Sequence, residues 1–173
     1  MSDRRQFLSS LLLEQEHEKH LRRAIALRAN NPRAPYAAVP VDAAKNEIVA
    51  EGWNKSPQNP LLHGGNGYHQ SRRRTAAGDR LGGTRAVHDR RTVSAEPCPM
   101  CMDAALWAGI PTIVYGSSIP LLTALGGNLA LGGNQIDIRA TKVARRTGFR
   151  RATVRGGVVE EECNALFLAA PEL

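Results

Sequence analysis

Two cysteines and one histidine are the residues of this chain whose types and spacing most clearly predict chemistry. The run Pro97-Cys98-Pro99-Met100-Cys101 places two thiols in a C-x-x-C arrangement at the start of a predicted helix. The positive end of the helix dipole lies there and favours thiolates. Two thiolates and an imidazole suit Zn²⁺, and three protein ligands leave a fourth position where the metal can activate a water molecule. His63 is the candidate imidazole, so the sequence predicts a zinc site made by His63, Cys98 and Cys101.

These side chains need a framework that brings them together, and the chain alternates between helical and strand patterns. The first predicted helix has the apolar residues Leu21, Ala24 and Ile25 at i, i+3 and i+4, which is typical of one buried face. Strands alternating with helices favour an α/β fold with a layered sheet. The predicted helices cover residues 14–30, 98–108 and 158–168, and the predicted strands cover 36–41, 47–51, 112–115 and 152–155.

The composition indicates one compact domain and no membrane span. With 173 residues, of which 42% are hydrophobic, the chain can bury a sizeable core, and no apolar run is long enough to cross a membrane. Three cysteines are an odd number, which argues against a secreted disulfide framework. The start Arg4-Arg5-Gln6-Phe7-Leu8 resembles a twin-arginine export signal, but acidic residues follow where such a signal needs an apolar core. We therefore predict a cytoplasmic protein with an N-terminal extension over 1–13 and a single domain over 14–173.

One segment differs in composition from the rest of the chain. The net charge is +7, and between Gly64 and Arg91 there are seven arginines against two aspartates. This stretch also has six glycines and no helical or strand periodicity, so residues 64–93 are predicted to be an anomalous basic segment that locally disrupts the sheet. One hypothesis is a nucleic-acid-binding module built on Arg72–Arg74. The lack of interleaved aromatic residues argues against it.

Several stretches of the chain carry a family resemblance. They are Asn59-Pro60-Leu61-Leu62-His63, Ala95-Glu96-Pro97-Cys98-Pro99-Met100-Cys101, Trp107-Ala108-Gly109, Ile113-Val114-Tyr115-Gly116 and Glu162-Cys163-Asn164-Ala165-Leu166-Phe167. Together they resemble the zinc-dependent cytidine and deoxycytidylate deaminase superfamily, which is marked by H-x-E followed by P-C-x-x-C. Trp107 and the last stretch are most similar to bacterial guanine-deaminase-type enzymes.

The resemblance implies a fold, a reaction and a set of site residues. The fold would be a three-layer α/β/α sandwich around a mixed five-stranded sheet, commonly as a homodimer. His63, Cys98 and Cys101 would bind Zn²⁺, and Asn54 would hydrogen-bond the substrate, a nucleobase or nucleoside of the guanine or cytosine type that is hydrolytically deaminated. Neither nucleic acid nor membrane is expected as a partner. From the residues alone, Asn54 is equally a turn residue after a strand, and Cys163 is a buried helix residue rather than a ligand.

The chain departs from the family pattern at the glutamate that moves protons. Family members have His-x-Glu, whereas this chain has His63-Gly64-Gly65. Glycine cannot move a proton, and loss of general acid–base catalysis costs about two to four powers of ten in rate. Glu96 is no substitute, because family members carry it in addition to the catalytic glutamate. We therefore expect zinc binding to survive and turnover by the chain as written to be lost, which leaves a non-catalytic zinc-binding pseudo-deaminase as an alternative.

The basic segment also lacks the helix and the strand that the family has between His-x-Glu and the cysteines. A reading frame shifted by one base is a single hypothesis that explains all of these losses. Permitted codons for residues 65–70, read one base later, encode Glu-Met-Ala-Thr-Ile, and the same offset across 80–91 encodes an apolar strand. Without that strand, backbone groups in the sheet have no partner, so we expect the chain as written to be poorly stable.

Overall fold

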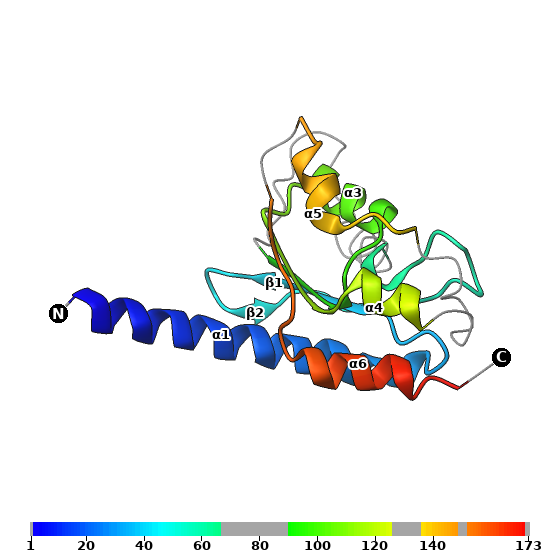
Figure 1. Ribbon diagram of the computed structural model, residues 1–173, viewed down its shortest axis with the longest axis horizontal. Coiled ribbons are helices and arrows are strands. Elements are labelled where there is room, and N and C mark those ends of the chain that lie inside the picture. The colour runs from blue at the N-terminus through cyan, green and yellow to red at the C-terminus, as the bar shows by residue number, and fades with distance from the viewer. Residues whose placement is uncertain (1, 67–89, 126–135, 149–151, 172–173) are drawn as a thin grey trace.

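A mixed β-sheet forms the middle layer of the computed structural model, which describes residues 2–66, 90–125, 136–148 and 152–171 (Figure 1). Its strands are β1 (Ala37–Asp42), β2 (Glu47–Ile48), β3 (Gly52–Trp53), β4 (Arg90–Ala95), β5 (Thr112–Ser117) and β6 (Thr153–Arg155). They run in the order β2-β1-β4-β5-β6, and β3 also pairs with β1. The pairs β1–β2, β1–β3 and β1–β4 are antiparallel, whereas β4–β5 and β5–β6 are parallel. The strand direction therefore changes between β1 and β4.

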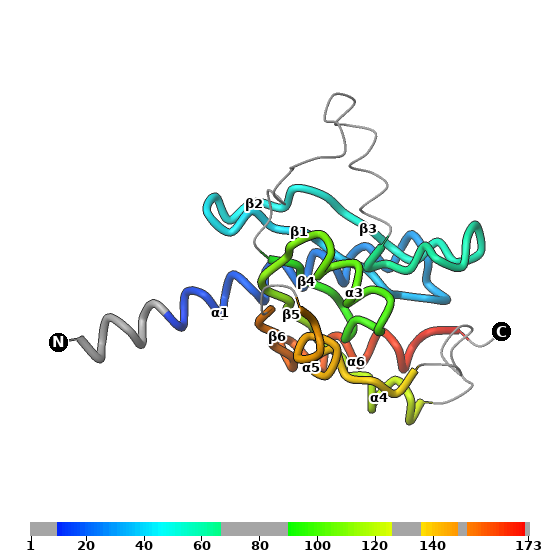
Figure 2. The backbone as a smooth tube through the Cα atoms, turned by 90° about the horizontal axis from the view of Figure 1, so that it is seen from above, coloured from blue at the N-terminus to red at the C-terminus, as the bar shows by residue number. Residues whose placement is uncertain are grey.

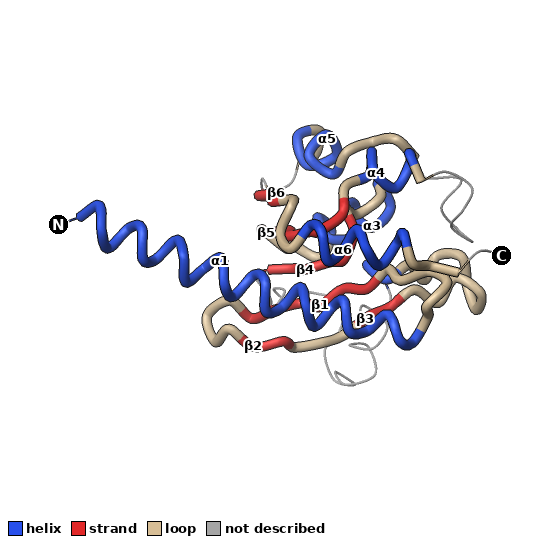
Figure 3. Tube along the Cα trace, turned by 60° about the horizontal axis from the view of Figure 1, so that its bottom comes forward, coloured by secondary structure: helices blue, strands red, loops and turns tan. Residues whose placement is uncertain are grey.

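Helices cover both faces of this sheet and complete three layers (Figures 1 and 3). One face carries α1 (Ser2–Ala26), which continues into the 3₁₀ turn η1 (Leu27–Asn30), together with α6 (Glu160–Leu168). The opposite face carries α3 (Pro99–Trp107) and α5 (Ala140–Arg145), and α4 (Ile119–Ala124) follows β5. Every residue of β1 and β4 is buried, because helices lie on both sides of the sheet. The predicted α/β/α sandwich is confirmed.

Apolar side chains fill the spaces between these layers. On the side of α1 and α6, Leu21 packs with Val114 and Cys163. On the other side, Met102 of α3 packs with Ile113 of β5 and with α5. Burying a side chain of this size fully contributes about 1.5–3 kcal/mol. This packing fixes α3, and with it the C-x-x-C motif, against the sheet.

β4 lies in the centre of the sheet, although the sequence predicted a disruption over 64–93. Val93 pairs with Ala38 of β1 on one side and with Tyr115 of β5 on the other. Backbone pairing with two neighbours outweighs the low strand propensity of two successive arginines, so the prediction was wrong for residues 90–93. Within the described ranges the sheet has six strands rather than five, because the short strand β3 pairs with one end of β1. Residues 67–89, and with them Arg72–Arg74, lie outside the described ranges.

Helix α1 begins at Ser2, before the predicted start at residue 14, and its first part extends beyond the sheet (Figures 1 and 2). The segment 11–13 consists of exposed leucines, because no sheet lies beneath it. Leu, Glu, Gln and Arg are good helix formers, which lets the helix continue without tertiary packing. The division at residue 14 between an extension and a domain stays a prediction. Among the described helices, none combines the length and the apolar character needed to cross a membrane.

Candidate metal centre

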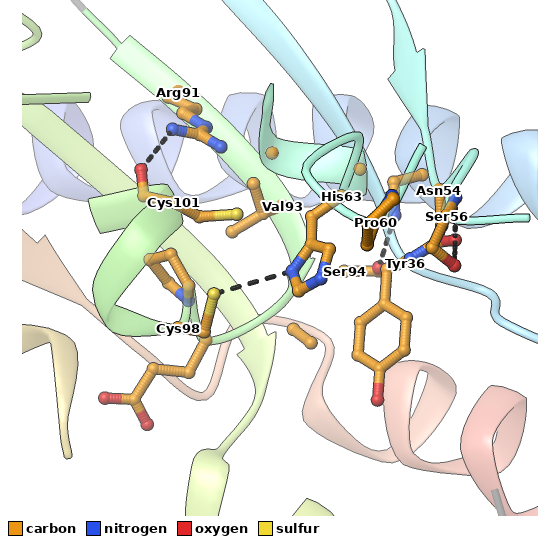
Figure 4. Close-up of a pocket in the computed structure, with 16 residues that line it drawn as sticks. Tyr36, Asn54, Ser56, Pro60, His63, Arg91, Val93, Ser94, Cys98 and Cys101 are labelled. Carbon is orange, nitrogen blue, oxygen red and sulfur yellow. Dashed lines mark hydrogen bonds between the residues drawn. The ribbon is translucent and has the colours of Figure 1, made fainter. Parts of the chain in front are cut away.

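His63, Cys98 and Cys101 form one cluster, although they come from distant parts of the chain (Figure 4). Their possible ligand atoms all lie within 4.8 Å of one another, and Cys98 Sγ is 3.6 Å from His63 Nδ1. A tetrahedral zinc ion with ordinary bond lengths separates a sulfur ligand from a nitrogen ligand by about 3.6 Å. The donor types and their spacing therefore fit Zn²⁺, and one ion could bind all three predicted ligands.

The two thiols are positioned by the start of α3. Cys98 is the N-cap residue, with φ −60° and ψ 166°, and Cys101 lies in the first turn. Pro99 occupies the first helical position, where its fixed φ suits the helix and its missing N–H is not needed. The backbone N of Met102 donates a hydrogen bond to the Cys98 carbonyl at 2.9 Å. Both thiols thus lie at the positive end of the helix dipole, as the sequence predicted.

His63 lies between a hydrogen-bonded turn and the beginning of a helical segment. Lys55 N donates to the Leu62 carbonyl at 2.8 Å, and Leu62 N donates to the Asn59 carbonyl at 2.8 Å. After His63 the chain enters a helical conformation, and Asn66 N donates to the His63 carbonyl at 2.8 Å. The backbone is therefore fixed on both sides of the imidazole, which limits its movement.

Hydrogen bonds within the cluster separate the acidities of the two thiols. The pKa of Cys98 is lowered to about 4, first because the Cys101 thiol donates a hydrogen bond to it and then because His63 contacts it. The same hydrogen bond, together with burial, raises the pKa of Cys101 well above its ordinary value. The contact with Cys98 raises the pKa of His63. One thiolate is thus stabilised by two neighbours.

A cavity of about 170 Å³ adjoins this cluster and is also bordered by Asn54 and Gly65. It is smaller than pockets for drug-sized ligands, which are about 300–1,000 Å³, and so suits a single small ring system. Asn54 is buried, and its Oδ1 accepts hydrogen bonds from Ser56 N at 3.0 Å and Ser56 Oγ at 2.7 Å (Figure 4). Asn54 is therefore a turn residue, as one interpretation of the sequence had it, and it also borders the cavity; its contact with a substrate stays a prediction.

Glu96 borders the cavity as well, but other groups bind its carboxylate. Oε1 accepts from Ala140 N at 2.9 Å, Oε2 accepts from Ile119 N at 3.0 Å, and Arg139 Nε lies 2.7 Å from Oε2. The Glu96 side chain has no exposed surface. Its carboxylate therefore links the N-terminal ends of α4 and α5 to the loop that carries Cys98. Sequence reasoning gave Glu96 no role, because this link joins residues far apart in the chain.

Arg91 is the residue of the cavity that sequence reasoning missed. It is fully buried, and its Nη1 donates to the Cys101 carbonyl at 3.0 Å (Figure 4). Arg91, Val93 and Ala95 share one face of β4, and all three border the cavity. Counting every second residue back from the cysteine motif would have placed Arg91 on the same strand face as Val93 and Ala95. The surrounding arginines and glycines made this strand pattern hard to recognise.

Cys163 and Trp107 lie outside the cluster. Cys163 is fully buried on α6, as expected, and burial raises its pKa to about 12. It is therefore a packing residue rather than a nucleophile or ligand. Trp107, at the end of α3, is 70% exposed.

Comparisons with known proteins identify a family and a fold. Residues 14–117 match the family described as the cytidine and deoxycytidylate deaminase zinc-binding region. A tRNA(Ile)-lysidine synthase of Deinococcus radiodurans is 37% identical over 133 residues, which are 75% of this chain and 20% of that protein. A second, from Deinococcus deserti, is 60% identical over 35 residues, which are 20% of this chain and 7% of that protein. The chain thus spans a fifth or less of the length of these curated relatives.

Solved structures with this fold include two enzymes. A guanine deaminase from Nitrosomonas europaea superposes with a TM-score of 0.68 at 18% identity, covering 87% of this chain and 82% of that one. A diaminohydroxyphosphoribosylaminopyrimidine deaminase/reductase from Thermotoga maritima superposes with a TM-score of 0.62 at 25% identity. In that case the match covers 90% of this chain and 40% of the other.

Proposed function

This chain belongs to the zinc-binding cytidine and deoxycytidylate deaminase family, and from that premise we propose that His63, Cys98 and Cys101 hold Zn²⁺ beside a pocket for a nucleobase or nucleoside. The single observation that carries the proposal is the arrangement of one imidazole and two thiols within 4.8 Å at the wall of a 170 Å³ cavity. The reaction is hydrolytic deamination of a ring of the guanine or cytosine type. The bacterial guanine deaminase among the structural neighbours supports this ring class.

Each part of the site has a distinct task in this reaction. When bound, zinc lowers the pKa of a water molecule and makes it a nucleophile. Asn54 orients the base: Ser56 holds its carboxamide oxygen, and its carboxamide nitrogen can donate to a ring acceptor. The apolar walls exclude bulk water, which strengthens that hydrogen bond. In the family pattern, a glutamate at the position of residue 65 carries protons from the attacking water to the leaving ammonia.

Gly65 limits the rate at which the chain as written can release ammonia. No side chain at this position accepts a proton, and Glu96 is bound to Arg139 and two helix ends. We therefore expect ammonia release at least about a hundredfold slower than in a family member with glutamate at this position. Base binding and zinc binding need no proton transfer and persist.

Metal content and base binding test this proposal directly. The purified chain should contain one zinc ion per chain by elemental analysis, and the variants His63→Ala, Cys98→Ser and Cys101→Ser should contain much less. Cys163→Ala is the matched control, because it removes a thiol that lies outside the cluster. Full zinc retention by the Cys98 and Cys101 variants would contradict the ligand set. Ammonia release by the unchanged chain clearly above that of the zinc-free protein would contradict the role of Gly65.

We also propose that the reading frame is shifted within the basic segment. Arg90 and Arg91 support this, because β4 buries two guanidinium groups in the centre of a sheet, where charged side chains are rare. DNA sequencing across the codons for residues 63–101 tests it. If the DNA has one base fewer near codon 65 than the chain as written requires, this codon encodes glutamate instead of glycine and the proposal is supported. A DNA sequence that encodes the chain as written would overturn the proposal.

A further inference from the structure

Gly65 lies in a space that has no room for any side chain while Arg91 keeps its position. A Cβ atom built on Gly65 would lie 1.9 Å from Arg91 Nη2 and 2.9 Å from Cys101 Sγ. Non-bonded carbon and nitrogen atoms do not approach this closely, so either the guanidinium moves or residue 65 stays glycine. Replacing Gly65 by glutamate would therefore not be sufficient, because Arg91 occupies the space that the new side chain needs.

Arg91 cannot easily leave this place. Its backbone pairs with Pro40 in β1 and Ile113 in β5, so the register of the central strand directs its side chain towards α3. The side chain is fully buried, and Nη1 is held by the Cys101 carbonyl at 3.0 Å. Moving the guanidinium into the adjoining cavity would break this hydrogen bond and would place the charge in the space that the base should occupy.

The charge of Arg91, like its volume, prevents a glutamate at position 65 from taking part in proton transfer. A guanidinium has five N–H donors and no acceptor, so it cannot take over the glutamate's role of accepting a proton from water. A glutamate introduced at position 65 would instead pair with Arg91, because a buried carboxylate and guanidinium attract strongly at this distance. The carboxylate would then be held away from the water that it should deprotonate.

We propose that residues 65 and 91 form a coupled pair that decides whether this site can catalyse deamination: Arg91 blocks residue 65, and a glutamate there is productive only when Arg91 is replaced. The inference rests on the proposed function at the same site and concerns the chain as written, in which residue 65 is glycine and residue 91 is arginine. Arg91 acts here as a blocking residue that excludes the proton-transfer group, and it takes no part in the reaction itself.

A stability cycle tests the coupling without any activity measurement. Gly65→Ala, Arg91→Met and the double variant are made in the full chain, and their thermal unfolding midpoints are compared. Gly65→Ala alone should lower the midpoint by about 5 °C or more, because the added methyl displaces the guanidinium. In the Arg91→Met background the same substitution should lower it by less than about half as much. Additive effects would overturn the proposal.

Arg90→Met is the matched control for this cycle. Arg90 is an arginine of the same strand on the opposite face, where it interacts with His17 and His20 of α1. Gly65→Ala combined with Arg90→Met should therefore be additive. Relief of the Gly65→Ala effect by both arginine variants would show a general loosening of β4 and would overturn the specific role of Arg91.

Ammonia release then separates this inference from the proposed function. With zinc bound, Gly65→Glu/Arg91→Met should release ammonia from guanine, cytosine or their nucleosides at least about tenfold faster than Gly65→Glu alone. Ammonia release that is clearly measurable and equal in the two variants would overturn the block by Arg91 while supporting the deaminase proposal. Coupling in the stability cycle with no ammonia from either variant would support the block and contradict the deaminase proposal. If Gly65→Glu does not fold, the alanine cycle still decides the coupling.

Discussion

Replacing Glu96 by glutamine should destabilise the protein more than the same substitution at a surface glutamate does. Glu96→Gln keeps the shape of the side chain but turns one acceptor oxygen into an NH₂ group. Because Oε1 accepts from Ala140 N and Oε2 from Ile119 N, the new NH₂ must face one of these backbone donors, whichever way the amide is turned. One buried N–H is then left without an acceptor, and the charge opposite Arg139 disappears.

The size of this effect follows from the contacts that are lost. A buried donor left without its partner costs about 1–3 kcal/mol, and a carboxylate at a helix N-terminus is worth a further 0.3–1 kcal/mol, roughly. We therefore expect a loss of about 3 kcal/mol, which for a chain of this length lowers the unfolding midpoint by about 6–12 °C. Thermal unfolding followed by circular dichroism measures this shift.

Glu162→Gln provides the control for this prediction. It is the same substitution at a side chain that is 46% exposed and paired with Arg22 on the surface. Exposed ion pairs contribute about 0–1 kcal/mol, so its midpoint should change little. If Glu96→Gln shifts the midpoint no more than Glu162→Gln does, the carboxylate does not link α4 and α5 as described.

Three further predictions concern acid stability, metal removal and base binding. The pKa of His17 is lowered from 6.5 to about 4, chiefly by burial and then by Arg90, so the unfolded chain takes up a proton that the folded protein does not. The free energy of unfolding should therefore be highest above pH 6.5 and should fall by about 3 kcal/mol as the pH is lowered to 4. Urea unfolding at several pH values measures this, and an equal pH dependence in His17→Asn would contradict it. A zinc chelator should lower the unfolding midpoint of the unchanged chain but not that of Cys98→Ser, because an ion that binds only the folded state stabilises it. An equal response of both proteins in a thermal shift assay would count against the metal site. Asn54→Ala should weaken base binding about tenfold in calorimetry, the effect of one lost hydrogen bond, while zinc content stays unchanged; an unaltered dissociation constant would remove Asn54 from the binding site.

The sequence was sufficient to predict the elements that local pattern determines. The apolar face with Leu21 and Ala24 indicated the first helix, and both side chains are fully buried. Pro99 after Cys98 indicated a helix start, and α3 begins there. These signals lie within a few residues of one another, so no knowledge of distant contacts was needed.

Features that depend on distant contacts could not be predicted in the same way. β4 is a strand because β1 and β5 pair with it on both sides, whereas its own arginines suggested a loop. The roles of Glu96 and Arg91 depend on helix ends and a carbonyl group that are distant in sequence or lie on the next element. Residues 10–13 of α1 were missed because they are exposed, so no buried face with a helical period marks them.

The link made by Glu96 also has an evolutionary consequence. One carboxylate anchors both Ile119 at the start of α4 and Ala140 at the start of α5, so the connection between these helices begins and ends at fixed points. Closing a longer connection between fixed ends adds only about 0.6 kcal/mol for each doubling of its length. Insertions and exchanges between α4 and α5 are therefore cheap for folding. This connection is where we expect related proteins to diverge most freely, and where a laboratory selection for new properties can sample the most sequence.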